Sequence, residues 1–235
     1  VLSDTAAAVS AGAHTEVIRF NQGVNGATLR NMTFQPGSNI NSAVIFIGGA
    51  GAGTTETNLT FENNFFGQAT DAQPLIDSNG QGAACTTWLI SYNTNATSNN
   101  LFAGGSTNCT SQANITLRGN LGKLNGANSC GNAVYDNNVW TNSAGCGGGD
   151  LANQRISFTG DGFHIPSTSP AVGNGAATCP ATDHDGEVRS GACDAGADQA
   201  GSGGTVDSTA PDTTLTSAPS GSTTSTSASM AFTAD

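Results

Sequence analysis

The sequence has few charged residues and very few basic ones. Charged residues make up 10% of the chain, compared with about 25% in an average soluble protein. The 17 acidic residues outnumber the 6 basic ones and give a net charge of -11. Nucleic acids and anionic membranes require a basic patch, so this balance argues against both as partners. Neutral or cationic partners, including Ca²⁺, are easier to accommodate, and the composition leaves the oligomeric state open.

Long apolar runs are also missing. No stretch approaches the ~20 apolar residues of a membrane-spanning helix, so no transmembrane segment is predicted. The first residues lack the basic-then-apolar pattern of a signal peptide, and we expect a mature or excised piece of a longer protein. Polar character is carried by Asn, Thr, Ser and Gly, which is typical of extracellular proteins. A secreted or cell-surface location is therefore predicted.

Residues that favour helices are sparse as well. Leu, Glu and Lys are uncommon, while Gly, Asn, Thr and Ser are abundant, a composition that suits strands and turns. No apolar stripe with i, i+3, i+4 spacing is found in the repeats described next. The sequence therefore predicts an all-β protein.

One phrase recurs along the chain. Its clearest copy runs from Asn58 to Phe66, and related copies lie at 27–32, 115–120 and 133–138, with a looser copy at 88–93. Apolar and polar residues alternate in each copy, as in a strand with one buried face. In the clearest copy this pattern places Leu59 and Phe61 inside and Thr60 and Glu62 outside.

The residue that follows each repeated strand is Asn or Gly. This column reads Asn31, Asn63, Gly119 and Asn137, and these two residue types tolerate the left-handed backbone region best. Each strand is therefore predicted to end in a tight bend. A coil that returns to the same face every ~20–30 residues, with longer insertions on some turns, indicates a solenoid. We interpret the repeats as a parallel β-helix.

Six cysteines form an even set without a C-x-x-C spacing, which favours disulfides over a zinc site or a redox dithiol. Six cysteines allow 15 connectivities. Neighbours in the sequence lie close together in a solenoid, so we favour sequential pairing, with buried free thiols as the alternative. The favoured pairs are Cys85 with Cys109, Cys130 with Cys146, and Cys179 with Cys193.

From Asp161 onward the repeat is no longer found, and a different set of motifs follows. This set contains three phrases, S-P-A-x-G-x-G from Ser169, C-P-x-x-D-x-x-G-x-x-R from Cys179 and C-D-x-G-A from Cys193. Together with the repeats, over about residues 58–199, these phrases resemble secreted bacterial right-handed parallel β-helix proteins of the choice-of-anchor Q type, which are similar to polysaccharide lyases. One difference is the ending Ala197-Asp198-Gln199, where the family continues with an aromatic residue and an acid.

The resemblance implies a right-handed parallel β-helix over residues 1–199, with a closing segment at 161–199, and a role on carbohydrate. Residues 200–206 form a Gly- and Ser-rich linker. Residues 207–235 look like the start of a bacterial Ig-like domain, with strands expected at 213–217 and 228–233. An Ig sandwich needs about seven strands, so this segment is expected to be truncated.

The outward residues at the ends of the repeated strands form a candidate binding surface. They are Arg30, Glu62, Arg118 and Asp136, with Ser91 as a further candidate between them. Equivalent positions of a parallel stack lie ~4.8 Å apart, so these side chains should form a line. Substrate sugars lie along such a face in the enzymes that the fold resembles. The alternative is a surface ladder in which each charge contributes only ~0–1 kcal/mol.

Catalysis would need acids and a base at one height of the stack. The candidates are Glu62, Arg118, Lys123 and Asp136, and Lys123 is included because β-elimination in similar folds uses a Lys or Arg base. An enzymatic role requires that Glu62 and Arg118 share a cleft. The sequence has no paired-carboxylate motif, and its three histidines, at positions 14, 164 and 184, stand isolated.

Acidic residues also gather beside Gly186. Asp183 and Asp185 are candidate ligands for Ca²⁺, although the spacing is not that of an EF-hand. The alternative is a turn that closes the solenoid through a salt bridge between Asp183 and Arg189.

Two hypotheses for function follow. The first is a secreted protein that binds or cleaves a polysaccharide or cell-surface glycan on its exposed sheet face; if it is an enzyme, it is a polysaccharide lyase or glycoside hydrolase. The second is a structural or adhesive cell-surface protein in which the β-helix forms a rigid stalk.

Overall fold

The structure is a computed structural model, and it describes most of the chain. The described residues are 16–20, 23–35, 43–47, 55–67, 75–77, 84–102, 111–124, 130, 133–142, 145–201, 214–217 and 231–233. The chain divides into two units, residues 1–202 and 203–235. The described residues form strands and turns without an α-helix, which confirms the all-β prediction, and so they contain no helix that could cross a membrane.

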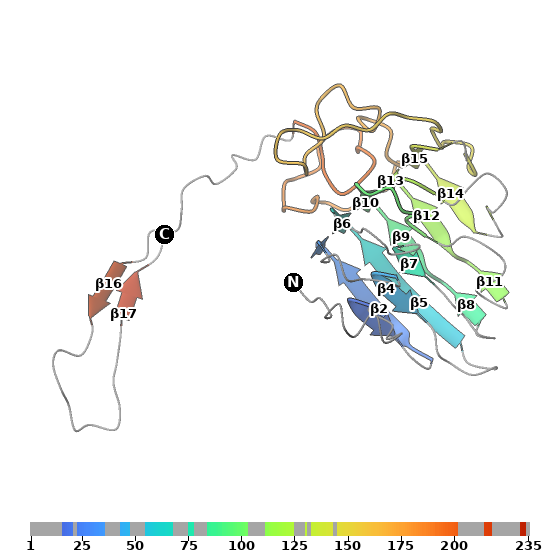
Figure 1. Ribbon diagram of the computed structural model, residues 1–235, viewed down its shortest axis with the longest axis horizontal. Helices are drawn as coiled ribbons and strands as arrows, with labels where there is room; N and C mark the ends of the chain where they lie inside the picture. Colours follow the sequence, from blue (N-terminus) through green and yellow to red (C-terminus); the bar gives the residue numbers. More distant parts are fainter. Residues whose placement is uncertain are drawn as a thin grey trace, which may run out of the picture. The chain divides into compact units, whose positions relative to one another are not determined.

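The described residues of the first unit form three sheets, and every strand pair in these sheets is parallel (Figure 1). One sheet holds β1 (Ile18–Phe20), β4 (Ile45–Ile47) and β7 (Ile76–Asp77). The second holds β3 (Thr33–Phe34), β6 (Phe65–Phe66), β10 (Thr94–Asn95), β13 (Leu121–Gly122) and β15 (Val139–Trp140).

The third sheet is built from the repeated phrase. Its strands β2 (Asn25–Arg30), β5 (Thr55–Glu62), β9 (Leu89–Ser91), β12 (Thr116–Arg118) and β14 (Val134–Asp136) lie side by side. Two further strands, β8 (Ala84–Thr86) and β11 (Ser111–Ala113), continue the sheet from the first half of β5. We call residues 25–140 the stacked repeats.

The repeats stack in the register that the sequence predicts. Phe61 pairs with Leu29 on one side and with Ile90 on the other. Leu117 continues the row from Ile90 to Tyr135. Leu59 and Phe61 are buried while Thr60 and Glu62 are partly exposed, so the predicted inward and outward faces are confirmed. The looser copy at 88–93 is a full member of the stack.

Every strand of the row ends in a left-handed bend, as predicted. The residues at the bends have φ values between 53° and 58°: Asn31, Asn63, Tyr92, Gly119 and Asn137. Tyr92 is the unexpected member, because bulky residues rarely adopt positive φ. A Cβ at Gly119 would lie 2.6 Å from the Tyr92 ring, so the tyrosine on one turn requires glycine on the next.

A second column, one residue after the bends, forms an asparagine ladder. Its members are Asn64, Asn93, Asn120 and Asn138, all essentially inaccessible to solvent. Each side-chain amide donates to the side-chain oxygen of the next member at 2.9–3.0 Å. The same amides donate to backbone carbonyls of the third sheet. Asp150 ends the ladder by accepting from Asn138. The ladder satisfies polar groups that would otherwise be costly to bury.

The predicted disulfides Cys130–Cys146 and Cys179–Cys193 are both formed. Cys85 is also disulfide-bonded, and Cys109 lies outside the described residues, so the predicted Cys85–Cys109 pairing stays a prediction. The described cysteines include no free thiol.

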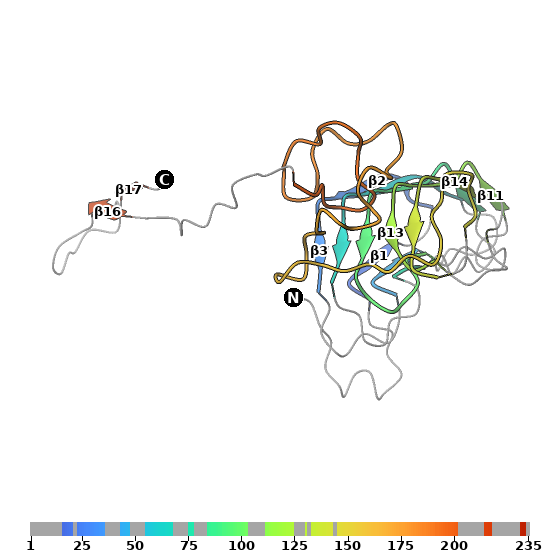
Figure 2. The same cartoon turned by 90° about the horizontal axis from the view of Figure 1, so that it is seen from above.

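The closing segment predicted at 161–199 extends in the structure by one residue to Ala200, whose amide donates to Asp194 Oδ2. Residues 161–200 contain no regular strand. The segment lies along the outer side of the stacked repeats, in orange in Figure 2. The Gly196 amide donates to the Gly119 carbonyl, and the Ala197 amide donates to Thr94 Oγ1, both at 2.7 Å. Its apolar residues Ile165, Ala171 and Ala195 pack against residues of β13 and β15. The segment therefore lies against the bends of successive turns.

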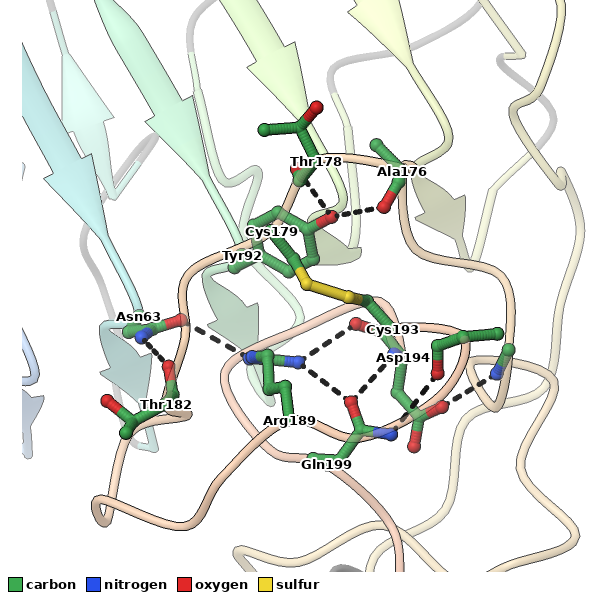
Figure 3. The surroundings of a disulfide bond; sticks show 12 residues. Asn63, Tyr92, Ala176, Thr178, Cys179, Thr182, Arg189, Cys193, Asp194 and Gln199 are labelled. Carbon is green, nitrogen blue, oxygen red and sulfur yellow. Dashed lines mark hydrogen bonds between the residues drawn. A yellow bond between two sulfur atoms is a disulfide. The ribbon is translucent and has the colours of Figure 1, made fainter.

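Arg189 anchors this segment to the repeats (Figure 3). It is buried, and its guanidinium lies 4.9 Å from the centre of the Tyr92 ring. It donates to Asn63 Oδ1 at 3.2 Å and to three carbonyls within the closing segment. The salt bridge predicted between Asp183 and Arg189 is not formed, because backbone amides occupy the Asp183 carboxylate.

In the second unit, β16 (Thr214–Ser217) and β17 (Ala231–Thr233) pair antiparallel. Both strands lie within the predicted ranges 213–217 and 228–233. Two strands do not define an immunoglobulin sandwich, so the start of an Ig-like domain stays a prediction.

Candidate functional site

The charged column predicted from the repeats is formed. Arg30 pairs in register with Glu62, and Glu62 pairs with Ser91 on the next turn. Arg118 then pairs with Ser91 and with Asp136. These five residues occupy the same position on five neighbouring strands, so their side chains project from one face of the third sheet. We call them the polar column.

The polar column contains two ion pairs with a serine between them. Arg30 Nε lies 2.7 Å from Glu62 Oε1, and Arg118 Nε donates to Asp136 Oδ2 at 2.8 Å. The Ser91 hydroxyl donates to Glu62 Oε2 at 3.2 Å. Arg30 and Arg118 each use their Nε atom in these ion pairs among the described residues. The terminal guanidinium nitrogens of both arginines can therefore donate to a ligand.

A pocket of about 300 Å³ lies over this column. Its floor comes from the third sheet, and its wall comes from the closing segment. The lining residues are Arg30, Glu62, Leu89, Ser91, Tyr92, Arg118, Thr178, Cys179 and Pro180. Residues nearly 150 positions apart in the sequence therefore meet at one site, which we call the polar pocket.

Specific contacts hold the wall in place. The Tyr92 hydroxyl donates to the carbonyls of Ala176 and Thr178 at 2.9 and 3.1 Å (Figure 3). The disulfide between Cys179 and Cys193 ties the wall to the rest of the closing segment. Burial raises the pKa of Tyr92 to about 12, so the hydroxyl keeps its proton and remains a donor even at alkaline pH.

The structure separates the candidate catalytic residues. Glu62 and Arg118 line the same pocket, which meets the condition set for an enzymatic role. Lys123 follows β13 in a different sheet, and its ammonium group donates to the Ser98 carbonyl at 2.9 Å. It is not among the residues that line the polar pocket. The proposed base therefore follows Arg118 on the same turn but lies on a different sheet, away from the face that carries the other candidates.

The two carboxylates of the polar column are also far apart. Glu62 and Asp136 are separated by three strand spacings, or roughly 14 Å at ~4.8 Å each. Paired catalytic carboxylates of glycoside hydrolases lie about 5–9.5 Å apart. This separation does not suit a hydrolase mechanism built on these two acids.

The predicted calcium ligands Asp183 and Asp185 have different surroundings. Asp183 is buried and accepts from the backbone amides of Glu187 and Gln199. Burial, with the hydrogen bond and charge of Asp185, raises the pKa of Asp183 to about 7. Asp185 is exposed and contacts both the Asp183 carboxyl and the His164 ring. Two carboxyls supply only part of the six to eight oxygen ligands that Ca²⁺ takes, so a Ca²⁺ site at Asp183 and Asp185 stays a prediction.

Two histidines that look isolated in the sequence have specific partners. His184 uses both ring nitrogens, with Nδ1 at 2.8 Å from the Asn63 carbonyl and Nε2 at 2.9 Å from Thr33 Oγ1. His164 lies between Asp161 and Asp185. Burial lowers the pKa of His164, but the hydrogen bonds to these two carboxylates outweigh it and raise the pKa to about 9.

Sequence reasoning missed the asparagine ladder and the surroundings of His164. The ladder had a visible signal, since Asn recurs one residue after four of the bends. One partner of His164, Asp161, is only three residues away, but the other, Asp185, comes 21 residues later, and no spacing rule connects the two. His14 lies outside the described residues.

No protein-family model matches the sequence, and no protein with curated annotation is significantly similar to it.

Proposed function

We propose that this chain is part of a secreted right-handed parallel β-helix protein that binds a polysaccharide in the polar pocket. The observation that carries the proposal is the pocket itself. Hydrogen-bonding groups from four successive strands converge there under a wall from the closing segment. The resemblance of residues 58–199 to choice-of-anchor Q proteins supports the β-helix and the secreted location.

The length and polarity of the pocket favour an oligosaccharide. Arg30 and Arg118 are separated by three strand spacings, or roughly 14 Å, so the floor extends along the stack. Guanidinium and carboxylate groups hydrogen-bond to hydroxyls of a sugar, and a few placed polar groups fix the orientation of a ligand.

The charge balance favours a neutral glycan over an acidic one. Each arginine of the polar column is already paired with a carboxylate, and the whole chain carries a net charge of -11. A polyanionic glycan would be repelled by this field. We therefore propose a neutral, hydroxyl-rich polysaccharide as the ligand.

Binding without cleavage fits the site better than catalysis. The carboxylates are too far apart for a glycosidase pair, and Lys123 is not placed to act as the base of a lyase. The proposed role is recognition of an extracellular glycan.

A glycan array followed by titration tests the proposal. We expect the purified chain to bind one class of neutral glycan, with weak dependence on salt. Arg118→Ala should weaken binding roughly 10- to 100-fold, since a hydrogen bond to a charged group contributes about 1.5–3 kcal/mol. Lys123→Ala is the matched control, because it removes one positive charge outside the pocket.

Equal loss in both variants would show that the effect is only one of overall charge. If the chain bound no glycan on the array, the proposal would be refuted and the second hypothesis, a cell-surface stalk, would be favoured. The continuous asparagine ladder and the parallel stack would serve such a stalk equally well.

A further inference from the structure

A second cluster of polar side chains lies within the closing segment. One ligand atom each from His164, Asp185 and Asp198 lies within 4.8 Å of the other two. His164 and Asp185 are in direct contact, with Nε2 at 3.0 Å from Asp185 Oδ2. These residues do not line the polar pocket.

Asp198 makes the cluster more than a group of surface acids. Its residue is only 2% exposed, and its Oδ1 atom has no hydrogen-bond partner within the described part of the chain. The other oxygen, Oδ2, accepts from the Ile165 amide at 2.6 Å. A buried carboxylate oxygen without a partner is costly, and a bound cation would relieve this cost.

The histidine is oriented for an ion at Nε2. Its Nδ1 atom contacts Asp161 Oδ2, and Asp161 is in turn held by the hydroxyl of Thr159 and the amide of Phe163. A carboxylate on the far nitrogen of a ligating histidine is the usual outer contact in metal sites, because it fixes the ring and raises its basicity. The Phe163 ring packs edge-on against the imidazole, with centres 4.8 Å apart.

We propose that His164, Asp185 and Asp198 form a divalent metal site, with Zn²⁺ as the ion that fits best. One imidazole and two carboxylates match the nitrogen and oxygen ligands of Zn²⁺. Ca²⁺ prefers six to eight oxygen ligands, which three side chains including a histidine do not supply. The ion takes the place of the proton that His164 shares with Asp185.

The site joins three parts of the closing segment that are distant in the sequence. His164 precedes the 169–175 loop, Asp185 lies in the turn before Arg189, and Asp198 lies near the end of the segment. An ion that holds all three would fasten the segment and stabilise the folded state over the unfolded one.

Metal titration of the purified chain tests the site. After treatment with a chelator, we expect a single Zn²⁺ to bind per chain in calorimetry and to raise Tm, with a smaller shift for Ca²⁺. His164→Gln and Asp198→Asn should each weaken Zn²⁺ binding more than tenfold, and Asp161→Asn should weaken it about tenfold through the loss of the outer contact.

Glu187→Gln is the matched control, because it changes a carboxylate to an amide in the same segment outside the cluster, and it should bind Zn²⁺ as the unmodified chain does. Circular dichroism of each variant without metal verifies that it is folded.

If His164→Gln or Asp198→Asn were unfolded, Co²⁺ added to the unmodified chain should still give the visible absorption of a site with a nitrogen ligand. The proposal is overturned if Zn²⁺ does not bind, if Glu187→Gln weakens binding equally, or if Ca²⁺ raises Tm as much as Zn²⁺.

Discussion

In the stacked repeats, residues 25–140, each buried asparagine of the ladder meets its equivalent on the next turn. In the closing segment, residues 161–200, each buried polar group has a different partner. Asn93 and Asn120 make the same contacts one turn apart, whereas Arg189 and Asp194 share no pattern with any neighbour. Repetition makes the first region predictable from the sequence, and individual contacts define the second.

The apolar packing of the two regions differs in the same way. The repeats bury large side chains such as Phe61, Trp88 and Trp140, while the buried apolar residues of the closing segment are alanines such as Ala171 and Ala195, with Ile165 as the one larger side chain. Since burial of apolar area contributes about 25 cal/mol per Å², the repeats hold most of the hydrophobic stabilisation. The closing segment depends more on polar contacts and on its disulfide.

The largest effect should come from breaking the asparagine ladder at its centre. Asn120→Ala removes two donated and two accepted hydrogen bonds in a fully buried site. We expect a loss of about 3–5 kcal/mol in the free energy of unfolding, because the partners left behind are buried. Urea denaturation measures this change. Asn137→Gly, at a left-handed bend, is the control and should cost less than ~1 kcal/mol; similar losses for both variants would contradict the role of the ladder.

Replacement of the anchor of the closing segment should have a smaller and more local effect. Arg189→Met keeps the aliphatic packing but removes the hydrogen bonds to Asn63 and to carbonyls of the segment. We expect a cost of about 2–4 kcal/mol, with proteolytic cleavage confined to residues 161–200. Mass spectrometry of the fragments locates the cleavage. Simultaneous cleavage within the stacked repeats would show that the two regions unfold together.

A matched pair of tyrosines sharpens the comparison further. Tyr92→Phe removes hydrogen bonds to two carbonyls of the closing segment, so we expect a loss of about 1–2 kcal/mol. The Tyr135 hydroxyl is buried without a hydrogen-bond partner among the described residues. Tyr135→Phe should therefore leave stability unchanged or raise it slightly. Thermal unfolding of both variants provides the test, and a larger loss for Tyr135→Phe would contradict the assigned contacts.

The predictable part of the fold follows from alternation and from the bends. Leu59 and Phe61 could be assigned to the core because strand side chains alternate, and Asn63 could be assigned to a bend because Asn tolerates positive φ. The same register placed Glu62 and Arg118 on one face. Tyr92 could not be predicted at a bend, because a bulky residue is strained at positive φ. Contacts with Arg189 and with the Thr178 carbonyl offset this strain, and no local sequence pattern reveals those contacts.

The wall of the polar pocket and the metal cluster could not be predicted in this way. Thr178 and Pro180 reach the pocket only because the closing segment folds back over the bends. His164 gains its neighbours from Asp185 and Asp198, which are far from it in the sequence. Such contacts depend on tertiary packing, whereas the repeats depend on a local period.

Hydrogen exchange of the unmodified chain in increasing urea tests the central claim most directly, namely that the closing segment is a separately held wall of the polar pocket. Amides of residues 161–200 should open with a lower free energy than those of β5 and β12, because the segment has no strand ladder and buries smaller side chains. Protection of the closing segment equal to that of the asparagine ladder would contradict this account.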